Sequence, residues 1–285
     1  MLRIFSLISL LACPQSCFTA HAHTSVQVPT SVPEGYKLVW WDEFETDGIP
    51  DPKRWDYDTY WNAQGWFNEE QQYYSARRAK NARIENGHLI IEAHHEPVPA
   101  RMFPDTGGQR YTSARLYTRE KAAWLRGYIE IRAKLPCGVG LWPAIWTMPA
   151  DDDDWPKGGE IDIMEFYGHK PRQFEATVHT VNQNHSLGNN IAAAYRTDSA
   201  CDRFYTHGLH WTEDIIRISI DGEIYFSVER ESDDPDDWPF TQPHYLIMNM
   251  AVRNWIGGEN GIDPDAFPAR MEVDYVRVYQ NPDAS

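Results

Sequence analysis

The chain has 285 residues and a formal net charge of −16, which together exclude several classes of protein. Its length allows a large buried core and favours one domain. The negative charge argues against nucleic acid and anionic lipid as partners, because both need clustered Lys and Arg, and weighs weakly against sulfated polysaccharides. Twelve Trp and fifteen Tyr slightly favour sugar binding, since aromatic faces suit sugar rings, although large β-sandwiches are also rich in aromatic residues.

Residues 1–22 are typical of a secretory signal peptide, with a positive start, an apolar centre and the small-x-small cleavage site Ala20-His21-Ala22. The mature chain would begin near His23. An alternative is a lipoprotein box that ends at Cys13, but the segment before it is short for one. No later segment reaches the roughly 18 apolar residues of a membrane span. We therefore predict an exported protein, extracellular or periplasmic, that binds no membrane.

Residues 23–35 are predicted to be a linker and residues 36–280 a single domain of short strands, without an amphipathic helix of usual length. Apolar and polar residues alternate without a break in Tyr128–Leu135, so we expect one face in the core and the other in water. Asp221-Gly222 predicts a type I′ hairpin turn. Other expected strands are Lys37–Trp41, His88–His94, Tyr111–Thr118, Phe174–Thr180, Ile216–Ile220, Glu223–Val228, His244–Ala251 and Met271–Tyr279. Many short strands without helices between them predict an all-β fold of antiparallel sheets.

Two acidic segments and two cysteines remain after removal of the signal peptide. Asp151–Asp154 and Asp233–Asp237 lie beside Trp and Pro and are predicted to be exposed loops. Either loop has the acids to bind a cation, but neither shows a regular ligand spacing, and we assign them no chemistry. Cys137 and Cys201 allow one disulfide bond or two free thiols, and both possibilities stay open.

The segment Glu160-Ile161-Asp162-Ile163-Met164-Glu165 places three carboxylates in one short apolar stretch. Carboxylates in a strand cost desolvation energy and lower β-propensity, so a purely structural strand would rarely carry three. Simple alternation places Glu160 and Asp162 on one face and Glu165 on the other. A β-bulge near Ile163-Met164 would return Glu165 to the first face. We therefore predict a bulged strand that presents all three acids to one cleft.

Paired carboxylates in a cleft are typical of glycosidases, which need an acid for the leaving oxygen and a second carboxylate as nucleophile or base. On a bulged strand the Cα atoms of Glu160 and Glu165 would lie roughly 13 Å apart, and inward-leaning side chains favour a retaining mechanism. Asp162 between them should raise at least one pKa in the cluster. The alternatives are a metal site, for which three acids alone offer too few ligands, or an exposed acidic strand.

The segment Gly159–Glu165 closely resembles the catalytic strand of glycoside hydrolase family 16, in the laminarinase-like branch marked by the inserted Met164. The resemblance covers about residues 36–280. It implies a β-jelly-roll sandwich of two antiparallel sheets with an open concave cleft. It also implies endo-hydrolysis of internal β-1,3 bonds in laminarin-like glucans by double displacement, with no cofactor required for the chemistry. Further segments that look like the family are Trp40–Phe44, Asn68–Tyr74, Ser113–Arg115, Leu141–Trp146 and Val273–Tyr279.

The resemblance assigns roles to matching residues of this chain. It implies that Glu160 is the nucleophile, Glu165 the general acid/base, and Asp162 the residue that tunes both. Substrate contacts are implied for Asn68, Arg115, Trp142, Trp146 and His179. The alternatives are core packing for Trp146, a surface hydrogen bond or ion pair for Asn68 and Arg115, and a purely structural role for His179.

A structural Ca²⁺ is implied on the convex face, with ligands from Glu43, the carbonyl of Gly87 and Asp274, although a cap or turn role for these acids is the alternative. Two segments depart from the family pattern, Phe204–Trp211 and Ala251–Gly257, and they leave open the choice between pure β-1,3 and mixed-linkage glucans.

The sequence favours a monomeric, secreted β-1,3-glucanase over two other functions. A hydrolase of another neutral β-glycan, such as agarose or a mixed-linkage glucan, is the enzymatic alternative. A non-catalytic β-glucan recognition protein is the third possibility. Such binders are expected to have lost catalytic carboxylates, whereas this chain retains Glu160, Asp162 and Glu165.

Overall fold

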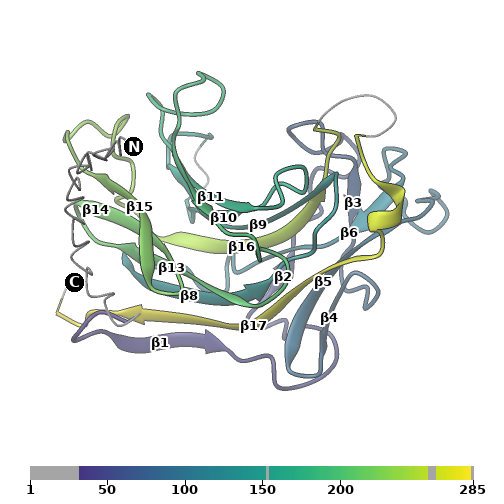
Figure 1. The fold of residues 1–285 in the computed structure, drawn as a ribbon, viewed down its shortest axis with the longest axis horizontal. Helices are drawn as coiled ribbons and strands as arrows, with labels where there is room; N and C mark the ends of the chain where they lie inside the picture. Colours follow the sequence, from purple (N-terminus) through teal and green to yellow (C-terminus); the bar gives the residue numbers. More distant parts are fainter. Residues whose placement is uncertain (1–31, 152–153, 256–260, 284–285) are drawn as a thin grey trace, which may run out of the picture.

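The computed structural model describes residues 32–151, 154–255 and 261–283, which form two β-sheets packed face to face (Figure 1). The predicted signal peptide, its alternative lipoprotein cysteine and most of the predicted linker lie outside the described residues. Ten strands form one sheet and seven form the other. Every named strand pair is antiparallel except β3 with β6. The expected all-β fold of two largely antiparallel sheets is confirmed.

The strands of the ten-stranded sheet are, in chain order, β1 (Lys37–Asp42), β3 (Gln72–Tyr74), β4 (Ala82–Glu85), β5 (His88–His95), β6 (Tyr111–Ser113), β8 (Gly127–Lys134), β13 (Tyr205–Trp211), β14 (Ile215–Ile220), β15 (Glu223–Glu229) and β17 (Ala269–Gln280). The seven-stranded sheet has the order β12 (Ile191–Arg196), β11 (Gln173–His179), β10 (Glu160–Glu165), β9 (Leu141–Pro149), β16 (His244–Val252), β7 (Arg115–Tyr117) and β2 (Asp56–Tyr57). The helix among the described residues is a short 3₁₀ turn, η1 (Pro264–Ala266).

Most predicted strands are confirmed within a few residues, but the one expected at Tyr111–Thr118 is divided. Its first half is β6 in the ten-stranded sheet, and its second half is β7 in the seven-stranded sheet. The fully buried Ala114 lies at the crossing. The predicted turn at Asp221-Gly222 is confirmed, because both residues have the positive φ values, 50° and 84°, that a type I′ turn requires.

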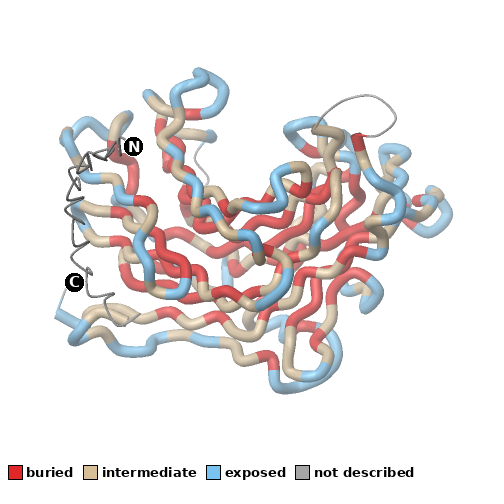
Figure 2. The backbone as a smooth tube through the Cα atoms, viewed as in Figure 1, coloured by how far each residue is buried: buried red, intermediate tan, exposed pale blue. Residues whose placement is uncertain are grey.

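The apolar core lies between the two sheets, and Figure 2 colours the buried residues of both sheets red. The expectation that the polar face of β8 is wet is wrong at Glu130, which is buried. The hydroxyl of Tyr275 donates to Glu130 Oε1 at 2.8 Å, and the hydroxyl of Tyr128 lies 3.4 Å from Oε2. These hydrogen bonds compensate for the lost solvation of the carboxylate.

Cys137 and Cys201 form a disulfide bond that joins segments 64 residues apart in the chain, with a Cα–Cα distance of 5.6 Å. The bond connects the loop after β8 with the loop before β13.

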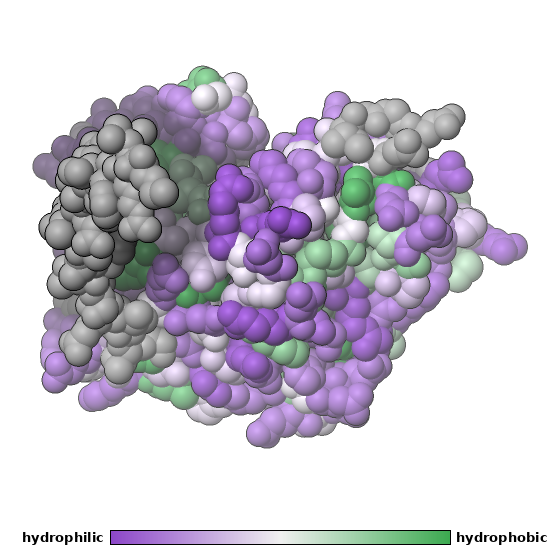
Figure 3. Space-filling view, viewed as in Figure 1, coloured by the Kyte–Doolittle hydropathy of each residue, from purple (hydrophilic) through white to green (hydrophobic). Residues whose placement is uncertain are grey.

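Within the described residues, no helix is long and apolar enough to cross a bilayer. The face drawn in Figure 3 is mostly hydrophilic, with smaller apolar patches.

Candidate active site

The predicted β-bulge is present in β10 and determines where the three acids point. Asp162 pairs with Trp146 of β9, and the next paired residues are Met164 and Ile145, so β10 has one extra residue there. The pairing with β11 shows the same shift between Asp162 and Glu165. Ile163 and Met164 are both fully buried in the core. The bulge therefore brings Glu165 to the same face as Glu160 and Asp162.

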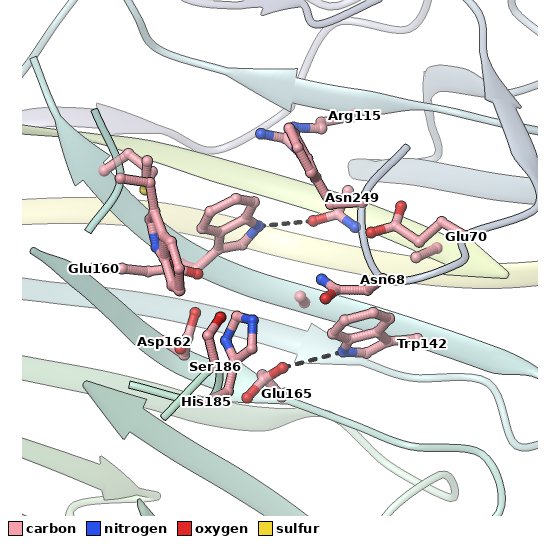
Figure 4. Close-up of a pocket in the computed structure, with 16 residues that line it drawn as sticks. Asn68, Glu70, Arg115, Trp142, Glu160, Asp162, Glu165, His185, Ser186 and Asn249 are labelled. Atoms are coloured by element: carbon pink, nitrogen blue, oxygen red, sulfur yellow. Dashed lines mark hydrogen bonds between the residues drawn. The ribbon is translucent and has the colours of Figure 1, made fainter. Parts of the chain in front are cut away.

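A cavity of about 360 Å³ opens on this face of the seven-stranded sheet. The acids line one side, and in Figure 4 the side chains of Asn68 and Asn249 lie across from them. The alternating residues of β9 that face the cavity are Trp142, Ala144, Trp146 and Met148.

Seven of the eight predicted catalytic and substrate-binding residues line this cavity: Asn68, Arg115, Trp142, Trp146, Glu160, Asp162 and Glu165. Trp146 lies on the cleft face rather than in the core, and its Nε1 donates to Asn249 Oδ1 at 2.8 Å (Figure 4). Arg115 is ion-paired with Asp58 at 3.0 Å, and its guanidinium carbon lies 4.7 Å from the centre of the Trp146 ring. Arg115 therefore supports the indole as well as lining the cavity.

His179 does not belong to the cavity lining but lies beside Asp162, on the neighbouring strand β11. Its Nε2 atom is 3.2 Å from Asp162 Oδ2, and both side chains are more than 90% buried. Register explains this position, since His179 pairs with Glu160 across β10 and β11. The charge of His179 lowers the pKa values of Glu160 and Glu165 and so partly opposes the effect of burial. Direct sugar contact by His179 stays a prediction.

The environment of the carboxylates raises their pKa values. Burial, and then the charge of Asp162, raise the pKa of Glu160 to about 8. Burial, and then the charge of Glu165, raise the pKa of Asp162 well above its ordinary value. Burial also raises the pKa of Glu165. The three groups therefore retain at least one shared proton near neutral pH, as expected for closely spaced carboxylates.

Hydrogen-bond donors act in the opposite direction and favour the ionised carboxylates. Trp155 Nε1 donates to Glu160 Oε2 at 2.5 Å. Glu165 accepts from Tyr167 Oη at 2.8 Å, from Trp142 Nε1 at 3.2 Å and from Thr177 Oγ1 at 3.3 Å. Burial and these donors together keep protonated and ionised forms both accessible, which a group that alternates between acid and base requires.

Sequence reasoning missed several residues of the cavity. Glu70 and Asn249 had usable signals, since Glu70 lies in the family-like segment Asn68–Tyr74 and Asn249 in a predicted strand. Trp155 is five residues before Glu160, between a proline and the acidic segment Asp151–Asp154, to which we assigned no chemistry. His185 has no local signal, because it reaches the site from the loop after β11. Other missed residues that line the cavity are Phe67, Ala144, Met148, Ser186 and Ala251.

The acids predicted to bind calcium have cationic partners in the structure. Both oxygens of Glu43 accept hydrogen bonds at 2.8 Å from Arg277, and Asp274 is paired with Arg132. A cation at these residues would have to displace two guanidinium groups, and calcium at this place stays a prediction. Among the described residues, the group of His, Cys, Asp and Glu side chains close enough to hold a metal is Glu160, Asp162 and His179, within the acid cluster itself.

Comparison with known proteins identifies the family. The sequence model described as "Glycosyl hydrolases family 16" matches residues 56–277. The chain belongs to this family. It is 48% identical over 254 residues to a beta-glucanase of Rhodothermus marinus, covering 86% of this chain and 85% of that protein. It is 36% identical over 258 residues to a glucan endo-1,3-beta-glucosidase of Cryptopygus antarcticus, covering 85% and 91%.

Among solved structures, a non-specific endo-beta-1,3(4)-glucanase from family 16 aligns with a TM-score of 0.84 at 47% identity, covering 89% of this chain and 94% of that one. The predicted β-jelly-roll fold and the assignment to the glycoside hydrolases are thereby confirmed.

Proposed function

We propose that the chain is an exported endo-glycosidase that hydrolyses internal β-1,3 bonds of laminarin-like glucans with retention of configuration. The observation that carries the proposal is the bulge in β10, which places Glu160 and Glu165 on one wall of the same cavity with Asp162 between them. Carboxylates from one short strand can approach a single glycosidic bond, as the retaining mechanism requires.

In the first step, the Glu160 carboxylate attacks the anomeric carbon while Glu165 gives its proton to the departing glycosidic oxygen. A covalent glycosyl ester forms at Glu160. In the second step, Glu165 takes a proton from water, the water oxygen attacks the anomeric carbon, and the ester bond to Glu160 breaks. Asp162, whose charge interacts with both acids, favours the movement of the shared proton between steps. The reaction uses side-chain carboxylates and water alone.

The cavity lining supports a neutral glycan as the substrate. Trp142 and Trp146 offer aromatic faces for sugar rings, and Asn68 and Asn249 offer amides for hydroxyl groups. Apart from His185, Arg115 is the one basic side chain on this lining, and its charge is already paired with Asp58. Sulfated or carboxylated sugars would meet four acidic residues on this lining with little compensating positive charge.

Mixed-linkage β-1,3/1,4-glucan is the second candidate substrate, because the aligned structure of the non-specific endo-beta-1,3(4)-glucanase is similar over most of this chain. Release of reducing sugar from laminarin, lichenan, agarose and cellulose tests both candidates. We expect the highest kcat/KM on laminarin. Activity on agarose without activity on laminarin would overturn the proposal, and equal activity on lichenan would assign the broader specificity.

Export is supported by the sequence of residues 1–22 and by the Cys137–Cys201 disulfide, since such bonds persist in oxidising compartments.

Structural calcium at Glu43, Gly87 and Asp274 remains a prediction from the family resemblance. Thermal denaturation with added Ca²⁺ and with chelator tests it, and an unchanged midpoint would support the Glu43–Arg277 ion pair instead.

A further inference from the structure

Three aromatic side chains project together from the loop between β2 and β3. Tyr60 is 77% exposed and Phe67 is 61% exposed, and the partly buried Trp61 lies between them. The ring centre of Trp61 is 5.2 Å from that of Tyr60 and 5.2 Å from that of Phe67, with interplanar angles of 89° and 66°. The three rings are therefore in edge-to-face contact and form one cluster, which we call the aromatic platform, in a loop that also exposes polar residues.

Hydrogen bonds from the fully buried Asn62 fix the backbone of the loop that carries the aromatic platform. Its Nδ2 donates to the Tyr74 carbonyl at 2.9 Å, while its Oδ1 accepts from Tyr74 N and from Trp66 Nε1, both at 3.0 Å. The buried Trp66 holds the next turn of the loop. A ligand that binds the platform therefore does not have to order this backbone, which preserves binding free energy.

The aromatic platform is continuous with the active-site cavity. Phe67 belongs both to the platform and to the cavity lining, where Asn68 follows it. The backbone N–H of Gln71 donates to the Val252 carbonyl at 2.8 Å, and this hydrogen bond fixes the end of the loop against β16. Figure 1 shows the loop beside β3, at the side of the seven-stranded sheet away from β11 and β12. A chain that leaves the cavity past Phe67 would reach Trp61 and Tyr60 next.

We propose that Tyr60, Trp61 and Phe67 bind additional sugar units of the same neutral β-glucan chain, beyond the cavity in which the bond is cleaved. This inference rests on the proposed function. The occupant follows from continuity with the cleft and from the chemistry of the rings, whose faces suit the C–H faces of sugars. The strong negative charge of the protein disfavours an anionic polymer on the same surface.

The test compares substrates of two lengths in wild type and in Trp61→Ala. One substrate is laminarin polymer, and the other is the shortest β-1,3-gluco-oligosaccharide that the wild type cleaves. We expect Trp61→Ala to lower kcat/KM on the polymer roughly threefold to tenfold, mainly through KM, which corresponds to a loss of about 0.7–1.4 kcal/mol of binding free energy. On the short substrate the change should stay below about twofold, since that substrate does not reach the platform.

Two further variants control the comparison. Tyr60→Ala removes the most exposed ring and tests the platform even if Trp61→Ala destabilises the loop, which circular dichroism and the denaturation midpoint would reveal. Trp41→Ala removes a tryptophan that is more exposed than Trp61, at 45%, and lies on β1 away from the cavity, so it should not change kcat/KM on either substrate. The platform would be overturned if Tyr60→Ala and Trp61→Ala lowered kcat/KM equally on both substrates. It would also be overturned if neither variant lowered kcat/KM on either substrate.

Binding measurements separate this inference from the proposed function. In affinity electrophoresis through laminarin, the inactive Glu160→Gln protein should be retarded, and adding Trp61→Ala should reduce the retardation. A wild-type protein that binds laminarin through the platform but cleaves none of it would overturn the proposed function alone. Retardation that is unchanged by Trp61→Ala and Tyr60→Ala would overturn the platform alone.

Discussion

The hydroxyl of Tyr167 donates a hydrogen bond of 2.8 Å to Glu165 Oε1, from a position two residues further along the chain. The ring of Tyr167 packs edge-on against Trp255, with centres 4.7 Å apart, and tilted against Trp142 at 5.7 Å. Burial and the neighbouring Glu165 raise the pKa of Tyr167 well above its ordinary value, so its hydroxyl keeps its proton. Tyr167 therefore stabilises the ionised form of the proposed acid/base and fixes the direction of its carboxylate.

Replacing Tyr167 with Phe should raise the pKa of Glu165 further, because the hydrogen bond from Tyr167 lowers it in the native protein. In the proposed mechanism Glu165 must be protonated in the free enzyme. The alkaline limb of the kcat/KM profile should therefore move to higher pH, by up to about one unit for a hydrogen bond to a charged group. The matched control is Tyr195→Phe, which removes a Tyr–Glu contact of 3.4 Å outside the cavity and should leave the profile unchanged. An unmoved alkaline limb in Tyr167→Phe would show that the contact is only structural.

Replacing Glu160 with Gln should abolish hydrolysis, with kcat lowered by at least about 10³-fold, because an amide cannot form the glycosyl ester. Binding of laminarin should be largely retained. The smaller variant Glu160→Ala, supplied with azide, should regain activity and release the product with inverted configuration, which NMR of the product detects. Glu272→Gln on β17, in the other sheet, is the isosteric control. Full activity of Glu160→Gln would show that the nucleophile assignment is wrong.

Replacing Glu160 with Gln should also make the protein more stable than wild type at alkaline pH. The pKa of Glu160 rises from an ordinary value of 4.5 to about 8 on folding, so the folded state binds this proton more tightly than the unfolded state. The free energy of unfolding should then fall as pH rises from about 4.5 towards 8. Glu160→Gln removes this loss, and its advantage in denaturation midpoint over wild type should be larger at pH 8 than at pH 5. We expect at least roughly 2 °C of difference, the shift that about 1 kcal/mol produces in a large domain. An advantage that does not change with pH would contradict the raised pKa.

Removing the disulfide should lower stability without changing the active-site chemistry. Cys137 and Cys201 enclose a loop of 64 residue steps, for which the chain-entropy treatment gives about 4 kcal/mol of stabilisation. Guanidinium denaturation of the double variant Cys137→Ser, Cys201→Ser should show a loss of this order, and wild type in reductant should approach the variant. Identical midpoints with and without reductant would show that the bond contributes nothing measurable.

Local sequence patterns were sufficient for the features that depend on neighbouring residues. Strand alternation, the Asp221-Gly222 turn and the bulge in β10 are all encoded within a few residues, because backbone conformation and side-chain direction are set locally. The extra residue in Ile163-Met164 predicted that Glu165 would join Glu160 on one face, and the pairing of β10 with β9 confirms it.

Tertiary structure decided the features that depend on contacts between distant segments. Sequence alternation gave no reason for Tyr111–Thr118 to divide between two sheets at Ala114, since only the packed sandwich determines where a strand must cross. Glu130 was expected in water but lies buried. The hydroxyl of Tyr275, 145 residues away along the chain, donates a hydrogen bond that replaces part of its lost hydration.

The same distinction holds within the site. The sequence alone determined the three acids, their common face and the family, because these depend on one short segment and its motif. Only the folded chain placed His179 beside Asp162, brought Trp155 to Glu160 and Tyr167 to Glu165, and joined Cys137 to Cys201. Burial and mutual distance set the pKa values of the acids, and both are properties of the packed sheets rather than of β10 by itself.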